Sequence, residues 1–342
     1  MVLVTGATGF IGSRLVERLS ADKKKEAILC LTSDQGNSQK EKTGLAIIKK
    51  LGLNFLEVDL LTGKGLDEIP KSPKIIFHLA ANTDTAVKDH RVNEIGTQNL
   101  LEAIKPIGSE THFIFTSSIA INDIREDYSH PVDETTAVPK RPCHEYGRRK
   151  LKSEQYLIQQ AKEWGFGLSI VRVCGVYGKG VRKGGLFDRI DTLVKKGSFL
   201  ARLNWPGRIS IIHLKDMVNF LILVSLLTPQ PGDYKIYIPS VEALSLAQMS
   251  QIIHEAYAID YKPIHLPAWV WEVGLILAKG KPILEAILPH KLYNKFWQGS
   301  ILINNEYWNT SQTIQQVLKD KKPITFREYY RNQVRLNSAG NP

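Results

Sequence analysis

Short apolar runs alternate with helical patterns through the first half of the chain. The runs are continuous rather than alternating in polarity, which is typical of strands in a parallel sheet covered on both faces. Because strands and helices take turns, we predict an α/β fold with a doubly wound parallel sheet of Rossmann type. The predicted strands lie at 2–5, 27–31, 54–58, 75–79, 112–116 and 168–173. The predicted helices lie at about 11–19, 92–104 and 145–164.

The pattern changes after residue 177. Glycine and basic residues gather at 178–185, and tryptophans are scattered through the less regular chain that follows. Strand-like pieces nevertheless recur at 209–212 and 234–238. We therefore predict that a smaller C-terminal α/β lobe, which binds substrate, is partly interleaved with the first layer. The predicted boundaries are 1–177 for the Rossmann domain, 178–335 for the substrate lobe and 336–342 for a frayed tail.

The composition is that of an ordinary soluble globular protein. Of 342 residues, 43% are hydrophobic and 23% are charged, which excludes collagen-like, disordered and coiled-coil chains. The most apolar later stretches, 220–227 and 268–278, are shorter than the roughly 20 residues that span a bilayer. The first residues do not resemble a signal peptide. Three widely spaced cysteines form neither a disulfide framework nor a zinc motif, so we expect no metal and a reducing, cytoplasmic setting.

The chain is basic, with 45 Lys and Arg against 34 Asp and Glu, a formal net charge of +11. Such a charge suits nucleic acid, an anionic membrane surface or an anionic ligand. No recognised nucleic-acid-binding motif accompanies it, so we predict no nucleic-acid partner. A small-molecule substrate and contact with a membrane surface remain open.

A glycine-rich segment follows the first predicted strand and opens the first helix. Residues 5–12 read TGATGFIG. A tight strand-to-helix turn needs a residue without Cβ at Gly6, close approach of a pyrophosphate needs one at Gly9, and close helix packing needs one at Gly12. The helix N-terminus adds N–H donors and partial positive charge. The segment predicts a dinucleotide site, with a purely structural turn as the alternative.

A tyrosine and a lysine share one face of the predicted helix at 145–164. Tyr146 and Lys150 are four residues apart. A neighbouring ammonium and an oxidised nicotinamide lower the pKa of a phenol, so Tyr146 can exchange a proton with a secondary alcohol during hydride transfer. Ser117 and Ser118 follow the strand at 112–116, at the edge of the sheet where ligands bind. A hydroxyl there can stabilise charge on a substrate oxygen.

The glycine loop, the serine pair and the Tyr–Lys pair, in this order, resemble the extended short-chain dehydrogenase/reductase superfamily. The likeness extends over about the first two-thirds of the chain and includes LEVDL at 56–60, HLAA at 78–81 and VRVCGVYGKG at 171–180. The resemblance implies that Ser118 is the catalytic hydroxyl, Tyr146 the acid/base and Lys150 its activator. It also implies a homodimer through the helices that carry Asn93 and Tyr146.

The same resemblance implies which residues contact the dinucleotide. They are Gly6, Thr8, Gly9, Phe10, Ile11, Gly12, Thr32, Asp59, Leu60, Ala80, Ala81, Tyr146, Lys150 and Val173.

The choice between NAD and NADP depends on the residues after the second strand. Thr32 and Ser33 offer hydroxyls, whereas Asp34 offers a carboxylate that would favour NAD. With Arg14 and Lys40 nearby, the hydroxyls would tolerate a 2′-phosphate, so NADP is slightly favoured.

Departures from the family pattern bear on the reaction. Ile119 and Ala120 stand where 4,6-dehydratases carry an Asp-Glu pair, and they cannot transfer protons. Gly175 stands where 4-epimerases often carry an asparagine. Asn122 and Asp123 replace a Tyr-Gly pair beside the substrate, so Asn122 is a candidate substrate contact.

Two arginines, Arg182 and Arg208, are candidate contacts for a substrate phosphate, with solvated surface arginines as the alternative. The apolar segment 266–289 resembles the helical segment of the 3β-hydroxysteroid dehydrogenase and dihydroflavonol-reductase branch. It can be a buried core helix pair, a lid over an apolar substrate or a membrane-surface contact.

We therefore expect an NAD(P)(H)-dependent oxidoreductase that transfers hydride to or from a secondary alcohol or ketone on a bulky, largely apolar substrate. One alternative is an NAD-dependent nucleotide-sugar epimerase, which returns the hydride to the same carbon. Another is a non-catalytic cofactor-binding regulator, which would have no need of Ser118, Tyr146 and Lys150 together.

Overall fold

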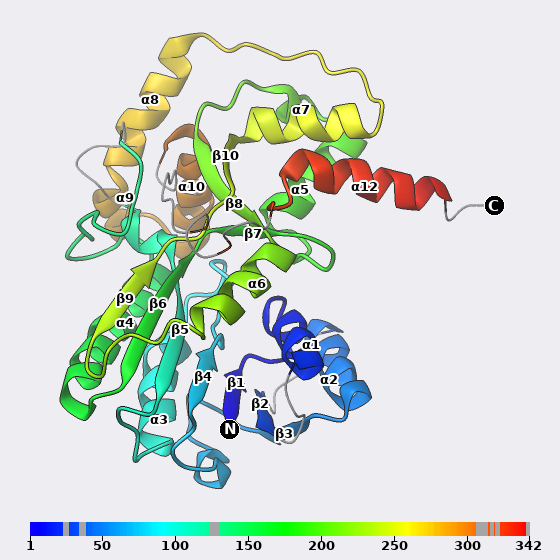
Figure 1. Ribbon diagram of the computed structural model, residues 1–342. Helices are drawn as coiled ribbons and strands as arrows, with labels where there is room; N and C mark the ends of the chain where they lie inside the picture. The colour runs from blue at the N-terminus through cyan, green and yellow to red at the C-terminus, as the bar shows by residue number, and fades with distance from the viewer. Residues whose placement is uncertain are drawn as a thin grey trace.

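The computed structural model describes residues 1–22, 27–33, 39–123, 130–305, 314, 318 and 322–339. Seven strands form one parallel sheet in the order β3-β2-β1-β4-β5-β6-β9, which confirms the predicted fold class (Figure 1). The strands are β1 Val2–Thr5, β2 Ile28–Thr32, β3 Asn54–Glu57, β4 Ile75–His78, β5 His112–Ser118, β6 Gly167–Val173 and β9 Tyr234–Tyr237. Each lies within two residues of its predicted bounds.

Helices cover both faces of this sheet because neighbouring strand residues point to opposite sides. Val2 and Val4 of β1 belong to the core shared with α1, α2 and α6, whereas Leu3 belongs to the core shared with α3 and α4. The helices are α1 Gly12–Asp22, α2 Gln39–Leu51, α6 Leu214–Val224, α3 Ile95–Ala103 and α4 Glu145–Trp164. The prediction for α4 is confirmed, but the predicted helix at 92–104 is divided into a short η3 turn, Arg91–Asn93, and α3.

A smaller sheet lies beyond the first one, in the order β10-β8-β7 (Figure 1). Its strands are β7 Gly175–Tyr177, β8 Arg208–His213 and β10 Glu242–Ser245, and β10 runs antiparallel to β8. The helices α5 Leu186–Lys195, α7 Leu246–Ala256 and α12 Phe326–Ala339 pack around it. The chain then interleaves as expected, because β9 comes after β8 in sequence but pairs with β6 in the large sheet.

Three further helices, α8 Ala268–Lys279, α9 Lys281–Ile287 and α10 His290–Ile303, follow α7 along the chain. In α8 and α9 only Ala278 and Lys281 are buried. The alternative in which the segment 266–289 forms a buried pair of core helices is therefore wrong. Short 3-10 turns are η2 Leu66–Glu68, η4 Ile119–Asn122 and η5 Phe199–Arg202. Helix α12 continues to Ala339, into the tail predicted at 336–342. Across the described ranges, no helix is long and apolar enough to cross a membrane.

Candidate active site

The glycine loop has the geometry that its spacing predicts. Gly6 has a φ of +63°, and a Cβ there would lie 2.7 Å from the backbone nitrogen of Ala80. A Cβ on Gly12 would lie 2.1 Å from the carbonyl oxygen of Gly6. The N–H of Gly9 donates to that same oxygen at 2.9 Å and closes the turn ahead of α1. Side chains at these positions would therefore displace the backbone of the loop or of its neighbour.

A cavity of about 500 Å³ opens over this loop at the carboxyl edge of the sheet. The carboxylate of Asp59 is oriented at its rim by the N–H groups of Leu61 and Thr62, at 2.8 and 3.2 Å. The predicted contacts that line the cavity are Gly6, Thr8, Gly9, Thr32, Asp59, Leu60, Ala80 and Ala81. A glycine-lined cradle that a Cβ would fill, at the N-terminus of a helix, fits a dinucleotide pyrophosphate.

The other predicted dinucleotide contacts do not line this cavity. Phe10 and Ile11 pack partly into the core behind the loop, and Phe10 lies near Gly180. Val173 ends β6 and is paired in register with Ser118 of β5.

Helix α2 supplies a wall of the same cavity, which the sequence reasoning missed. Glu41 of α2 lines it, and Gly44 packs on the loop so closely that a Cβ would lie 2.2 Å from the carbonyl oxygen of Thr8. The amphipathic run GLAIIKKL at 44–51 was the available signal for this helix.

The structure brings Ser118, Tyr146 and Lys150 together where β5 meets α4. The hydroxyl of Ser118 lies near enough to the phenol of Tyr146 to lower the pKa of that phenol. That hydroxyl also accepts the N–H of Ala120 at 3.2 Å and begins the η4 turn. The hydroxyl of Ser117, in contrast, is buried without a hydrogen-bond partner in the described part of the chain. The choice of Ser118 over Ser117 therefore has a geometric basis.

Lys150 is buried, one turn after Tyr146 on α4. Its Nζ donates to the carbonyl oxygen of Thr116 at 2.8 Å and lies 4.6 Å from the centre of the Phe115 ring. Burial lowers the pKa of Lys150 to about 7, against an opposing effect of Glu154.

The expected lowering of the Tyr146 pKa is not found. Burial raises the pKa of the phenol, and the nearby Ser118 hydroxyl only partly offsets this.

Of the two residues that depart from the family pattern, Asn122 is buried and Asp123 has a structural role. Both polar side-chain atoms of Asn122 are buried with no hydrogen-bond partner among the described residues, and its role as a substrate contact stays a prediction. The carboxylate of Asp123 accepts the N–H groups of Cys143 and His144 at 2.9 and 3.0 Å, and the indole N–H of Trp297 at 3.2 Å. Asp123 thus anchors the segment that enters α4.

The entry to α4 is completed by His144. Its Nδ1 accepts the backbone N–H of Tyr146 at 3.1 Å, which caps the helix and sets the first turn on which the tyrosine stands. Burial lowers the pKa of His144 to about 4, so the ring is neutral at pH 7 and can accept this bond.

A second cavity, of about 510 Å³, adjoins the first at the loop after β4. Asn82 lines the first cavity and Thr83 the second. This loop is held by Asn93, whose side chain bonds both the N–H and the carbonyl of Asn82. The ring of His90 links the loop to Tyr146, because its Nδ1 lies 3.1 Å from the Asn82 carbonyl and its ring centre 5.7 Å from that of Tyr146.

The second cavity carries both charge and apolar surface. Arg182 and Arg189 line it, and Arg182 pairs with Asp84 at 2.9 Å. Its walls are otherwise mainly apolar: Leu186, Ile190, Leu193, Leu200, Trp205, Ile209, Leu246, Ile301 and Leu302. Arg208 is exposed at the start of β8 and is not among the lining residues, so the structure places only Arg182 of the two predicted arginines in the cavity.

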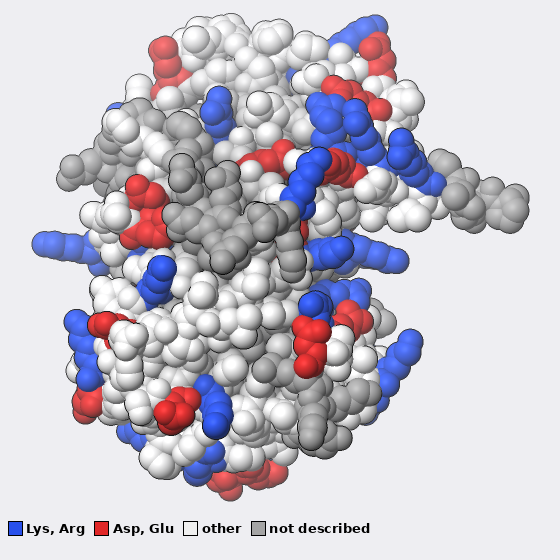
Figure 2. All heavy atoms as spheres, viewed as in Figure 1, with Lys and Arg blue, Asp and Glu red and all other residues white. Residues whose placement is uncertain are grey.

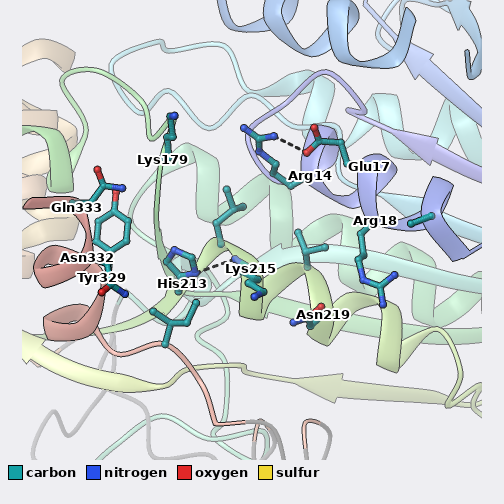
Figure 3. Close-up of a pocket in the computed structure, with 14 residues that line it drawn as sticks. Arg14, Glu17, Arg18, Lys179, His213, Lys215, Asn219, Tyr329, Asn332 and Gln333 are labelled. Atoms are coloured by element: carbon teal, nitrogen blue, oxygen red, sulfur yellow. Dashed lines mark hydrogen bonds and ion pairs between the residues drawn. The ribbon is translucent and has the colours of Figure 1, made fainter. Parts of the chain in front are cut away.

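Arg14 faces away from the dinucleotide site. It lines a third cavity, of about 600 Å³, between α1, α6 and α12, which shares no lining residue with the cavity over the glycine loop (Figure 3). Its Nη1 pairs with Oε2 of Glu17 at 2.6 Å. The expectation that Arg14 helps to hold a 2′-phosphate is therefore wrong. Asp34 and the side chain of Lys40 lie outside the described residues.

Known proteins resemble this chain over most of its length. The family model of the NAD dependent epimerase/dehydratase family matches residues 2–236. The CDP-paratose 2-epimerase of Salmonella typhi is 24% identical over 320 residues, which cover 84% of this chain and 93% of that protein. The UDP-glucose 4-epimerase of Vibrio cholerae is 26% identical over 279 residues, 79% of each chain.

Among solved structures, a mutant UDP-glucuronic acid 4-epimerase from Bacillus cereus, in complex with UDP-4-deoxy-4-fluoro-glucuronic acid and NAD, covers 99% of both chains. The TM-score is 0.73 at 17% sequence identity, which is a likeness of fold.

Proposed function

Because the chain belongs to the NAD-dependent epimerase/dehydratase family, we propose that it epimerises a nucleotide-linked sugar at a carbon that bears a secondary hydroxyl. The sequence alone favoured a reductase of an apolar substrate. Similarity over most of the chain to two nucleotide-sugar epimerases supports the alternative instead. The observation that carries the proposal is a cavity lined by Arg182 and Arg189 that adjoins the cavity over the glycine loop at Asn82 and Thr83.

The proposed roles follow from these positions. A nicotinamide dinucleotide, held by the glycine loop and the Asp59 rim, supplies a hydride acceptor and donor when bound. Tyr146 takes the proton of the substrate hydroxyl during oxidation and returns a proton during reduction. Ser118 hydrogen-bonds the substrate oxygen and stabilises its partial negative charge. Lys150, held by Thr116 one turn along α4 from Tyr146, supplies positive charge to the site whenever it is protonated.

The second cavity suits a substrate with a diphosphate. Arg182 and Arg189 bring two guanidinium groups to its lining, and Asp84 compensates one of them. Trp205 offers an aromatic face to a nucleobase. The loop at Asn82, which His90 connects to Tyr146, lies where the two cavities adjoin.

We propose NAD rather than NADP as the cofactor. Arg14 is turned into another cavity, and Glu41 adds a carboxylate to the lining that contains Thr32. A carboxylate near the ribose would repel a 2′-phosphate and accept a bond from a 2′-hydroxyl. The Kd values for NAD and NADP, measured by quenching of tryptophan fluorescence, test this; tighter binding of NADP would contradict it.

The experiment for the reaction uses UDP-glucose, UDP-glucuronic acid and CDP-linked hexoses with added NAD. Proton NMR follows the sugar, and absorbance follows the reduced cofactor. We expect a new epimer without net accumulation of NADH. Net NADH formation in proportion to substrate, with no epimer, would identify a dehydrogenase and reject the epimerase.

A second candidate, a reductase of a bulky apolar ketone, is favoured by the apolar walls of the second cavity. It predicts stoichiometric consumption of NADH or NADPH by aryl or alicyclic ketones. The same protein would then leave every nucleotide sugar unchanged.

A further inference from the structure

Exposed apolar side chains gather on α8, α9 and the start of α10. Within the described residues, fifteen large apolar side chains are exposed, and seven of them fall in the 24 residues from 269 to 292. Single exposed apolar residues are ordinary, whereas a contiguous group marks an interaction surface. We call this group the apolar face: Trp269, Val273, Ile276, Leu277, Ile283, Ile287 and Leu292.

Helix α8 has two different sides. Residues 269, 273, 276 and 277 fall in one stripe about 100° wide at the spacing of an α-helix. On another side, the Trp271 ring lies 5.2 Å from the Trp205 ring, and a Cβ on Gly274 would lie 2.9 Å from Cδ1 of Ile303. Packing of the inner side holds the helix in place, so the apolar face is a fixed feature of the fold.

The exposed charges beside the apolar face are mainly positive. Lys279, Lys291 and Lys295 are exposed, against Glu272 alone among the acidic residues of 268–295. Glu285 is drawn inward by its ion pair with Arg148 at 2.6 Å. The surface over the end of the molecule where α8 lies is mainly uncharged in Figure 2.

We propose that the apolar face docks on an anionic lipid bilayer. Isoleucine and leucine side chains would enter the acyl boundary, Trp269 would lie at headgroup level, and the three lysines would meet the anionic headgroups. Helix α8 has 12 residues and rises about 18 Å, so it lies along the interface. A second copy fits this face less well, because a two-fold interface would bring the same lysines close to one another.

Sedimentation of the full-length protein with vesicles tests the proposal. The vesicles are phosphatidylcholine alone or phosphatidylcholine with phosphatidylglycerol at a ratio of about 70 to 30. We expect binding to the anionic vesicles, weaker binding to neutral ones and loss of the difference at high salt. Recovery of all protein in the supernatant with both vesicle types overturns the proposal.

Variants distinguish the apolar face from general basic charge. Ile276→Asp together with Ile283→Asp should lower the vesicle partition coefficient by about tenfold or more. Leu336→Asp is the matched control, because Leu336 on α12 is 69% exposed, as Ile283 is, and should leave partitioning unchanged. Equal binding by the double variant would overturn the proposal.

Light scattering after gel filtration tests whether a second copy of the chain, rather than a bilayer, covers the apolar face. Suppose that the wild-type protein binds neither vesicle type and is a dimer, and that the double variant is a monomer. These results would assign the apolar face to a second copy. Because none of these measurements requires turnover, the outcome is independent of the proposed reaction.

Discussion

The ammonium of Lys150 donates a hydrogen bond to the carbonyl oxygen of Thr116, 2.8 Å away. Thr116 lies two residues before Ser118 on β5, so one strand end positions both the lysine and the serine beside Tyr146. The geometry of the site therefore depends on how the end of β5 is positioned against α4. Substitutions at these residues should separate effects on activity from effects on stability.

Lys150→Met should remove most activity and leave the fold intact. Methionine keeps the apolar stem but lacks the buried ammonium, so we expect turnover to fall by about a hundredfold or more and stability at pH 7 to be equal or higher. The pKa of Lys150 in the folded protein is about 7, below its unfolded value. Between these values the unfolded state binds more protons, so wild-type stability should rise with pH above 7.

Thermal unfolding of wild type and Lys150→Met from pH 7 to pH 10 measures this difference. The variant should lack the rise contributed by Lys150. Parallel profiles would show that Lys150 does not titrate in this range.

Tyr146→Phe should abolish proton transfer and preserve dinucleotide binding. The ring remains to pack against His90, while the hydroxyl beside Ser118 is lost. We expect kcat to fall by roughly 10²- to 10⁴-fold. Steady-state rates and a fluorescence titration with NAD provide the two readouts; wild-type turnover would refute the acid/base role.

Gly44→Ala should disturb the glycine loop from outside it. The new Cβ would meet the carbonyl oxygen of Thr8 at 2.2 Å and the Cα of Thr8 at 2.5 Å. We expect the free energy of unfolding to fall by about 1–3 kcal/mol and dinucleotide affinity to fall with it. Gly299→Ala in α10 is the control, because a Cβ there meets nothing within 4 Å and should add about 0.5–1 kcal/mol. Urea unfolding of both variants decides the comparison.

Acid should destabilise the protein through buried neutral histidines. Burial lowers the pKa of His78 to about 3 and the pKa values of His112 and His144 to about 4. Below about pH 6.5 these histidines bind protons in the unfolded chain but not in the folded chain. The free energy of unfolding therefore decreases as the pH falls below that value. Each such histidine contributes a slope of about 1.4 kcal/mol per pH unit.

The variant His112→Gln isolates one of these groups. Nε2 of His112 lies 2.8 Å from the Ser169 hydroxyl, a contact that an amide can partly replace. We expect lower stability at pH 7 but a shallower loss between pH 6.5 and pH 4. Chemical unfolding at several pH values measures the slopes, and identical slopes would count against the burial argument.

The sequence by itself determined the large sheet, the glycine loop and the Tyr146–Lys150 pair. These features follow from short-range regularities: continuous apolar runs make buried strands, Gly6 must adopt a positive φ, and residues four apart share a helix face. The missed α2 belongs to the same class of signal, since its amphipathic run is visible at 44–51.

Only the tertiary structure decided what depends on residues far apart in the chain. Asp123 serves the entry to α4 and is held there by Trp297, 174 residues away. The direction of Arg14 is set by Glu17 and by the cavity that α6 and α12 form with α1. The apolar residues of 266–289 looked suited to a core, yet packing on Trp205 and Ile303 occupies one side of α8 and leaves the other exposed. Hydrophobicity sets how much surface favours burial, whereas the contacts between distant segments determine which of it is buried.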